Sequence, residues 1–161
     1  MRLPIETERL TIRPLREEDA EALHAVWSDP EVFRYLPADP SASLEETRTR
    51  MARHLNKELA LWAVEERASG VLAGVCGLVP VQGTGPDIEV AYHLARRRWG
   101  RGIATEAASA CVAAGLAHGL PRVVAYAFTE NAASIRVLEK AGLRRAGTRR
   151  AYGAELAFFS T

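Results

Sequence analysis

The chain has 161 residues, of which 48% are hydrophobic and 25% charged, a composition typical of a globular protein with a buried core. Lys and Arg total 21 and Asp and Glu total 20, a near-balance that argues against a general nucleic-acid binder. No apolar stretch has the length of a signal peptide or a membrane span. We therefore expect a cytoplasmic protein with no nucleic-acid or membrane partner, folded as a single domain over residues 1–161.

The first half of the chain predicts a strand, two helices and three strands. Leu10 and Ile12 alternate with polar neighbours, which is typical of a strand. A helical pattern follows, with acidic residues in its first turn and Asp29-Pro30 as its end. A capping box of Ser43 and Glu46 opens a second helix. Three strand-like runs then follow at residues 58–66, 71–81 and 87–94.

The second half predicts two further helices and three strands. Residues 103–117 form an Ala-rich helix with an apolar stripe, and residues 131–142 form a helix capped by Asn131 and Gly142. A buried strand at residues 122–128 lies between them, and residues 143–160 form two strands. The order β-α-α-β-β-β-α-β-α-β-β predicts an α/β fold with helices covering a mixed sheet.

A basic, glycine-containing loop lies between the strand at 87–94 and the helix at 103–117. Its sequence "RRRWGRGIATEA" covers residues 96–107 and places Gly100 and Gly102 just before the helix. The first N–H groups of a helix lack internal partners and carry partial positive charge, so anions bind there. Glycines let the backbone approach a phosphate. A P-loop would need Gly-Lys-Ser/Thr, and a dinucleotide fingerprint would need a glycine at position 105, which is Thr105.

The loop resembles the acyl-coenzyme A loop of the GNAT superfamily of N-acetyltransferases, with its Gln/Arg-x-x-Gly-x-Gly/Ala signature. Its Trp-Gly-x-Gly-x-Ala-Thr-Glu-Ala form is similar to the branch of ribosomal-protein N-terminal (Rim-type) acetyltransferases. "TENAASIRVLEKAGL" resembles that branch's Asn-x-x-Ser helix, and "TERLTIRPLREEDAEAL" resembles its first strand and helix. The resemblance implies a largely antiparallel sheet with a splayed central strand pair, covered by about four helices.

The resemblance also implies acetyl-CoA as co-substrate, with its pyrophosphate on the loop amides and its pantetheine beside the strand at 87–94. Asn131 and Ser134 would face the pantetheine and the sulfur. The residues expected to bind acetyl-CoA are His93, Leu94, Arg97, Arg98, Trp99, Gly100, Arg101, Gly102, Ile103, Ala104, Thr105, Asn131 and Ser134.

Acetyl transfer requires a base that deprotonates the attacking amine. Glu89 is the first candidate, because the family often places an acidic base early in this strand, and His93 is the second. The alternative for Glu89 is a solvent-facing position on a half-exposed strand. Backbone N–H groups near His93 and Leu94 are candidates to polarise the thioester carbonyl.

The departing thiolate lacks the tyrosine that many relatives supply, because Leu138 occupies the position seven residues after Asn131. Ser134 remains as the nearby hydroxyl and as the second catalytic candidate. Leu138 keeps open an alternative from another class, a non-catalytic acyl-CoA-binding sensor. The favoured hypothesis is direct transfer to a primary amine in a ternary complex.

The acceptor amine stays open between a protein N-terminus, a polyamine, an amino acid and an antibiotic amine. Residues 30–43, with Phe33 and Tyr35, either border the acceptor cleft or form an ordinary connector. Cys76 and Cys111 lie in apolar runs and are expected to be buried rather than to carry an acyl group. The histidines show no metal-ligand spacing, so no metal is expected. A homodimer is left open.

Overall fold

The computed structural model describes residues 1–161 as one mixed sheet of eight strands with helices on both faces. The spatial order of the strands is β1-β2-β3-β4-β5-β6-β8-β7. Every neighbouring pair is antiparallel except β5 and β6, which run parallel. The strands are β1 (Ile5–Glu6), β2 (Leu10–Arg13), β3 (Leu61–Glu66), β4 (Leu72–Pro80), β5 (Ile88–Leu94), β6 (Val124–Ala127), β7 (Arg144–Ala151) and β8 (Ala154–Ser160).

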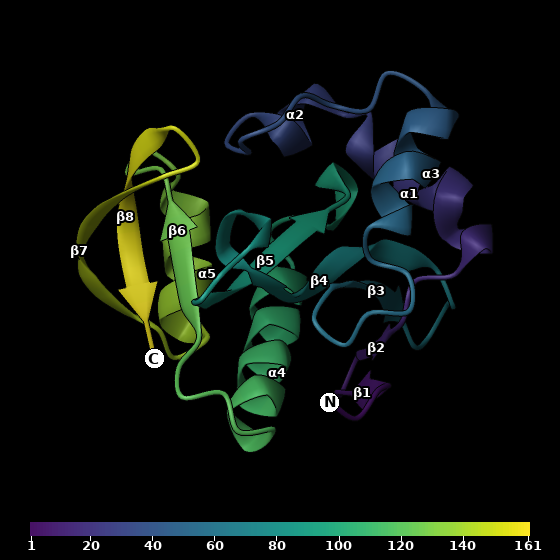
Figure 1. Cartoon of the computed structure of the whole chain (residues 1–161). Coiled ribbons are helices and arrows are strands. Elements are labelled where there is room, and N and C mark those ends of the chain that lie inside the picture. The colour runs from purple at the N-terminus through teal and green to yellow at the C-terminus, as the bar shows by residue number, and fades with distance from the viewer.

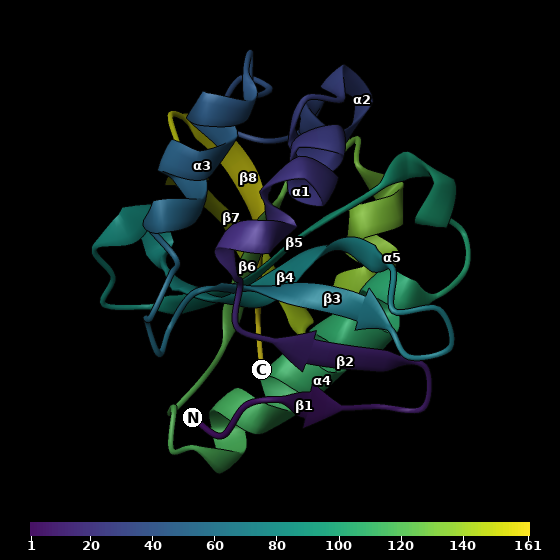
Figure 2. The ribbon, with the colours of Figure 1, turned by 90° about the vertical axis from the view of Figure 1, so that its right-hand side faces the viewer.

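The helices divide between the two faces of the sheet. In Figure 2, α1 and α3 lie above the sheet and α4 lies beneath it. The α-helices are α1 (Ala20–Trp27), α2 (Pro30–Phe33), α3 (Leu44–Ala52), α4 (Ile103–Ala117) and α5 (Ala132–Lys140). Short 3-10 turns precede α1, follow β4 and precede α4.

Each face of the sheet has its own hydrophobic core. The larger core joins the sheet to α4 and α5 and includes Trp62, Cys111 and Phe159. The smaller core joins the sheet to α1 and α3 and includes Leu23 and Met51. The alternation along β5 follows from this division, since side chains of a strand point to opposite faces in turn. Val90 and Leu94 belong to the larger core, whereas Ala91 packs against the smaller one.

The central strands β5 and β6 separate after a single paired position. Glu89 pairs with Val124, and beyond that point the strands diverge, so that β6, β8 and β7 form one half of the sheet and β1 to β5 the other (Figure 1). The connection from β5 through α4 to β6 is the expected parallel crossover. The expected α/β fold, with a largely antiparallel sheet and a splayed central strand pair, is therefore confirmed.

Two local expectations differ from the structure. Asp29 does not only end the first helix: its side chain accepts a hydrogen bond from the Glu31 N–H at 3.0 Å and caps α2, which was not expected. The Ser43 hydroxyl caps α3 as predicted, but the Glu46 carboxylate accepts from the Ala42 N–H rather than from Ser43. Asn131 caps α5 as predicted, by accepting from the Ser134 N–H at 3.2 Å.

Candidate active site

A cleft of about 1090 Å³ lies where β5 and β6 diverge. Its floor is β5, and its walls come from both halves of the sheet. One wall carries α2, the chain after it and the end of α3. The other carries α5, β6 and the turn between β7 and β8. Residues 31–38 line it, so the segment that carries Phe33 and Tyr35 borders the cleft.

Glu89 lines this cleft and is buried. The alternative interpretation, a solvent-facing position on a half-exposed strand, is therefore wrong. Only 7% of its surface is exposed, and burial raises the pKa of its carboxyl from 4.5 to about 8. The Tyr152 hydroxyl donates a hydrogen bond to the Glu89 Oε1 atom. A carboxyl group with a pKa near neutral is suited to accept and release protons at physiological pH.

Tyr152 reaches Glu89 from the turn between β7 and β8, in the other half of the sheet. Its hydroxyl also accepts a hydrogen bond from the Gln82 N–H at 3.0 Å, and its own N–H donates to Gln82 Oε1 at 3.3 Å. The Tyr126 ring packs edge-on against the Tyr152 ring, with centroids 6.3 Å apart. Local sequence patterns carry no signal for this contact, because 63 residues separate Glu89 from Tyr152.

His93 lies two residues beyond Ala91 on the Glu89 face, but it is poorly placed to act as a base. The Trp27 indole N–H, which can only donate, binds the His93 Nδ1 atom at 3.1 Å. The ring lone pair is thereby occupied, and the second nitrogen, Nε2, carries the proton. Burial lowers the pKa of His93 to about 4, so the ring is neutral at pH 7.

The backbone N–H groups of His93 and Leu94 point to opposite edges of β5. Ala95 donates its N–H to the Ala73 carbonyl at 2.9 Å. Because N–H directions alternate along an antiparallel strand, the His93 N–H also points toward β4. The Leu94 N–H therefore points into the gap beside β6, and of the two expected donors it is the one directed into the cleft.

The glycine loop presents a row of free backbone donors at the start of α4. None of the N–H groups from Gly100 to Thr105 donates to a backbone carbonyl, and the first internal bond of α4 runs from the Glu106 N–H to Gly102 O at 3.0 Å. Gly100 and Gly102 have φ angles of +70° and +76°, the left-handed conformation that glycine adopts without steric cost. Such a nest of N–H groups at a helix N-terminus binds phosphate groups.

The loop arginines have different partners. Arg98 pairs with Glu66 at 2.5 Å and its N–H donates to Ala95 O, so this expected binding residue is engaged within the protein. Arg96 pairs with Asp29 at 3.3 Å. Arg97 and Arg101 are exposed and form no ion pair. The indole N–H of Trp99 donates to Leu94 O at 2.9 Å, which ties the loop to the end of β5.

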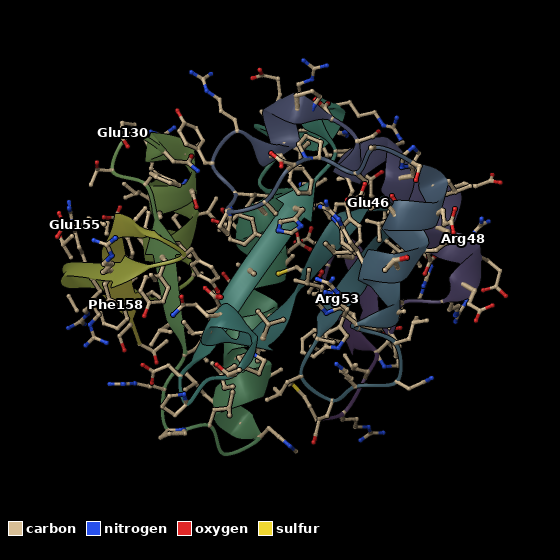
Figure 3. All side chains as sticks on the ribbon, turned by 45° about the horizontal axis from the view of Figure 1, so that its top comes forward. Glu46, Arg48, Arg53, Glu130, Glu155 and Phe158 are labelled. Atoms are coloured by element: carbon tan, nitrogen blue, oxygen red, sulfur yellow. The ribbon has the colours of Figure 1, made fainter.

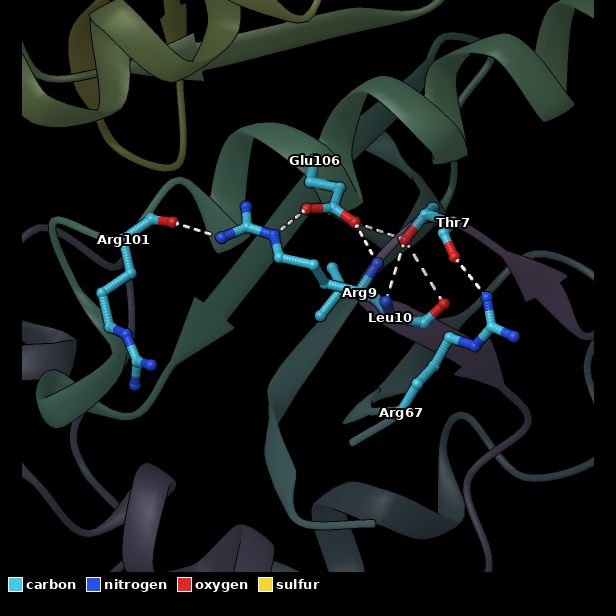
Figure 4. A network of polar contacts seen from close by, with 6 residues as sticks. All are labelled: Thr7, Arg9, Leu10, Arg67, Arg101 and Glu106. Carbon is cyan, nitrogen blue, oxygen red and sulfur yellow. Dashed lines mark hydrogen bonds and ion pairs between the residues drawn. The ribbon is translucent and has the colours of Figure 1, made fainter. Parts of the chain in front are cut away.

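Arg9 anchors the loop from the first strands of the chain (Figure 4). Its Nε donates to Glu106 Oε2 at 2.6 Å and its Nη1 donates to Arg101 O at 2.8 Å. Glu106 also accepts from the Thr7 hydroxyl at 2.6 Å and from the Arg9 N–H at 2.9 Å. Glu106 therefore holds the helix start against β2, a role that the motif at 96–107 alone did not reveal.

Tyr92 and Ser134 meet on the other face of β5. The Tyr92 and Ser134 hydroxyl oxygens lie 2.7 Å apart, and both residues line the cleft. Burial raises the pKa of Tyr92, so its hydroxyl stays protonated at neutral pH. Leu138 is only 1% exposed and belongs to the larger core. The expected position 138 holds no tyrosine, but β5 brings the Tyr92 hydroxyl to Ser134, a contact that the sequence did not predict.

The cleft gathers some of the expected residues and leaves others outside it. It is lined by the following members of the expected set: Glu89, His93, Leu94, Trp99, Gly100, Ala104, Asn131 and Ser134. Arg97, Arg98, Arg101, Gly102, Ile103 and Thr105 do not line it, and Ile103 packs in the larger core.

The cysteines, the possible metal ligands and the helix lengths also bear on expectations from the sequence. Cys76 and Cys111 are free thiols and are fully buried, and the neighbouring Cys111 thiol together with burial raises the pKa of Cys76. The His, Cys, Asp and Glu side chains form no group of three that can hold a metal ion. Even the longest helix, α4, is too short to cross a membrane.

Comparison with known proteins agrees with this geometry. A family model described as the acetyltransferase (GNAT) domain matches residues 9–144. The protein YoaA of Bacillus subtilis, described as an uncharacterized N-acetyltransferase, is 34% identical over 153 residues, which cover 92% of this chain and 86% of YoaA. The crystal structure of a GNAT-family acetyltransferase from Bacillus anthracis has a TM-score of 0.86 at 27% identity, covering 98% of this chain and 96% of that one. A spermidine N-acetyltransferase from Vibrio cholerae, solved with CoA and spermine, shares the fold with a TM-score of 0.79 at 17% identity over 96% of both chains.

Proposed function

The chain belongs to the GNAT family of acetyltransferases, and from this premise we propose that it is an acetyl-CoA-dependent N-acetyltransferase that acts on a primary amine by direct transfer in a ternary complex. We further propose that residues 1–161 act as one domain, in the cytoplasm. The observation that carries the proposal is the cleft itself, which extends from Gly100 and Ala104 of the glycine loop to the buried carboxyl group of Glu89.

The glycine loop fits the pyrophosphate of acetyl-CoA. The N–H groups from Gly100 to Thr105 lack internal acceptors, and Arg97 and Arg101 are the loop arginines without an internal ion pair. Both features suit an anion that receives several charge-assisted hydrogen bonds. Asn131 and Ser134 at the start of α5 would face the pantetheine, and the Leu94 N–H would bind the thioester carbonyl oxygen. When bound, acetyl-CoA supplies the activated acetyl group.

In this proposal the attacking amine and the departing sulfur are served by side chains on opposite faces of β5. Glu89 and Tyr92 are three residues apart, so their side chains leave the strand on opposite sides. Glu89 accepts the proton that the amine loses as the new C–N bond forms. The Tyr92–Ser134 hydroxyl pair donates a proton to the sulfur as the C–S bond breaks. The sensor alternative rested on the absence of a tyrosine at 138, and the Tyr92 hydroxyl removes that argument.

Two classes of acceptor amine fit the proposed activity. The likeness of residues 96–107 and 129–143 to the Rim-type branch supports a protein N-terminus as acceptor, and a small-molecule amine is the other candidate. Release of free thiol from acetyl-CoA across a panel of amines tests the activity. Initial rates at varied concentrations of both substrates should give intersecting double-reciprocal lines. Parallel lines would indicate a covalent acyl-enzyme and overturn direct transfer.

A further inference from the structure

One wall of the cleft is basic along its length. The wall consists of the end of α3 and the chain that follows it, and it carries Arg50, Arg53, His54 and Lys57. The Leu61 N–H donates to His54 Nδ1 at 3.2 Å. Leu61 pairs with Gly77, and Gly77 pairs with Ala91. His54 thus lies in register with the middle of β5, between Glu89 and His93.

Two cations of this wall have no internal partner. Arg50 pairs with Glu46 at 2.6 Å, but Arg53 and Lys57 form no ion pair. Burial, together with the charges of Lys57 and Arg53, lowers the pKa of His54 to about 4. His54 is therefore neutral, and the two free cations lie close enough together to act on it jointly.

The carboxylates of the cleft do not neutralise these cations. Glu46 is already bound to Arg50 and to the Ala42 N–H. Glu31 lies 3.9 Å from Arg34. Glu89 is buried and hydrogen-bonded to Tyr152, and its raised pKa leaves much of it uncharged at neutral pH. The cleft that holds the carboxyl group assigned as the base therefore also presents unpaired positive charge.

We infer that the acceptor is a primary amine that also carries an anionic group, such as a carboxylate, which binds Arg53 and Lys57 while the amine reaches Glu89. This inference rests on the proposed function and narrows its substrate class. A carboxylate accepts charge-assisted hydrogen bonds from both cations. Polycationic acceptors, such as polyamines and aminoglycosides, would instead meet like charge on this wall.

The direct test compares amines that differ only in their anionic group. Thiol release from acetyl-CoA is measured with free amino acids, with the same amino acids as carboxamides, and with spermidine. A third arm uses C-terminally amidated peptides that carry Asp or Ala at the second position. We expect kcat/KM to be about tenfold or more higher for the acid of a pair than for its neutral partner. The arm with the larger gain identifies a free amino acid or an acidic N-terminus as the source of the anionic group.

Charge reversal on the wall provides the second test. In Figure 3, Arg53 lies on the side of α3 toward β5, whereas Arg48 lies on the outer side of the same helix. The double variant Arg53→Glu, Lys57→Glu should raise KM for the acidic amine about tenfold or more, and it should leave KM for acetyl-CoA and the rate with the carboxamide near wild type. Arg48→Glu is the matched control, because Arg48 is exposed and does not line the cleft.

The outcomes separate this inference from the activity on which it rests. Transfer to amines with equal kcat/KM for acids and carboxamides would overturn the inference and leave the proposed activity intact. A rise in KM for acetyl-CoA in the double variant would show that the wall serves the coenzyme instead, and would also overturn it. Failure to acetylate any amine would overturn the proposed activity and the inference together.

Discussion

At the scale of single residues, two side chains that line the cleft, Glu89 and Tyr92, have raised pKa values. Glu89 is kept from water by the surrounding strands and by Tyr152, and burial raises its pKa to about 8. Tyr92 is kept protonated by burial and lies against Ser134. Burial raises both pKa values, which suits the roles that we propose: Glu89 as a base that titrates near neutral pH and Tyr92 as an acid that keeps its proton.

The first prediction concerns Glu89→Gln. The wild-type kcat should rise with pH and level off above about 8, because only the deprotonated carboxylate accepts the proton of the amine. The variant should lose a factor of about 10² to 10⁴ in kcat and lose this pH dependence, while binding acetyl-CoA normally. Thiol release from pH 6 to pH 9.5, at saturating amine, measures it.

Glu130→Gln is the control for this prediction, because Glu130 is exposed and does not line the cleft. Near-wild-type rates for Glu89→Gln at every pH would remove Glu89 from the mechanism. His93 would not then be the obvious substitute, since its Nδ1 atom already accepts from Trp27.

The second prediction concerns the Tyr92–Ser134 pair. Tyr92→Phe and Ser134→Ala should each lower kcat with little change in KM for the amine, because the pair acts on the sulfur. The double variant should be about as slow as the slower single variant, since both remove one hydrogen-bonded chain. A double-mutant cycle on kcat tests this. Fully additive losses would show that the two hydroxyls act independently.

At the scale of elements, the start of α4 presents free backbone N–H groups, to which we propose that the pyrophosphate binds, and contacts with Arg9 hold this helix end in place. The left-handed angles at Gly100 and Gly102 aim the N–H groups outward. The Arg9–Glu106 ion pair, at 2.6 Å, fixes the helix start against β2. Binding by this element therefore depends on backbone conformation and on an anchor that does not itself touch the anion.

The third prediction concerns Gly102→Asp. The new carboxylate adds negative charge beside the pyrophosphate, and a non-glycine residue at φ +76° is strained. Affinity for acetyl-CoA should fall at least tenfold to a hundredfold, about 1–3 kcal/mol. Isothermal calorimetry on the folded variant measures it. The control is Gly119→Asp, which imposes a similar strain, at φ +99°, just after the opposite end of α4. Equal affinities for Gly102→Asp and wild type would show that the loop does not hold the pyrophosphate.

At the scale of the whole molecule, the splayed sheet places buried ionisable groups where two halves of the fold meet. Glu89 has a raised pKa of about 8, whereas His54 and His93 have lowered pKa values of about 4. A raised pKa makes the folded state bind a proton more tightly than the unfolded state, and a lowered pKa has the opposite effect. As pH rises, titration of the two histidines therefore increases the free energy of unfolding, whereas titration of Glu89 decreases it.

The fourth prediction is a stability maximum near pH 6.5. From pH 4.5 to 6.5 the two histidines favour folding as pH rises, and their effect exceeds the opposing effect of Glu89. Above pH 6.5 only Glu89 changes, so stability should fall as pH approaches 8, by at most about 1.4 kcal/mol per pH unit. Urea unfolding at several pH values measures it. Glu89→Gln should abolish the fall above pH 6.5, and an unchanged fall in that variant would assign it to another group.

The sequence by itself determined the local elements and the family resemblance. The alternation in β5, the caps at Ser43 and Asn131 and the turn glycines act through neighbours along the chain, so their effect is visible in the sequence. The glycine loop was found for the same reason, because its N–H groups come from consecutive residues. The short β1 and α2 were missed because a few residues carry too little periodicity.

Only the tertiary structure decided which side chains share the cleft and how they are protonated. Tyr152 reaches Glu89 across 63 residues, Arg9 reaches Glu106 across 97, and Tyr92 reaches Ser134 across 42. Each contact depends on strand order and register, which local sequence patterns do not specify. The burial of Glu89, and with it the rise in its pKa, depends on the packing of both halves of the sheet, because desolvation is a property of all surrounding atoms rather than of one residue.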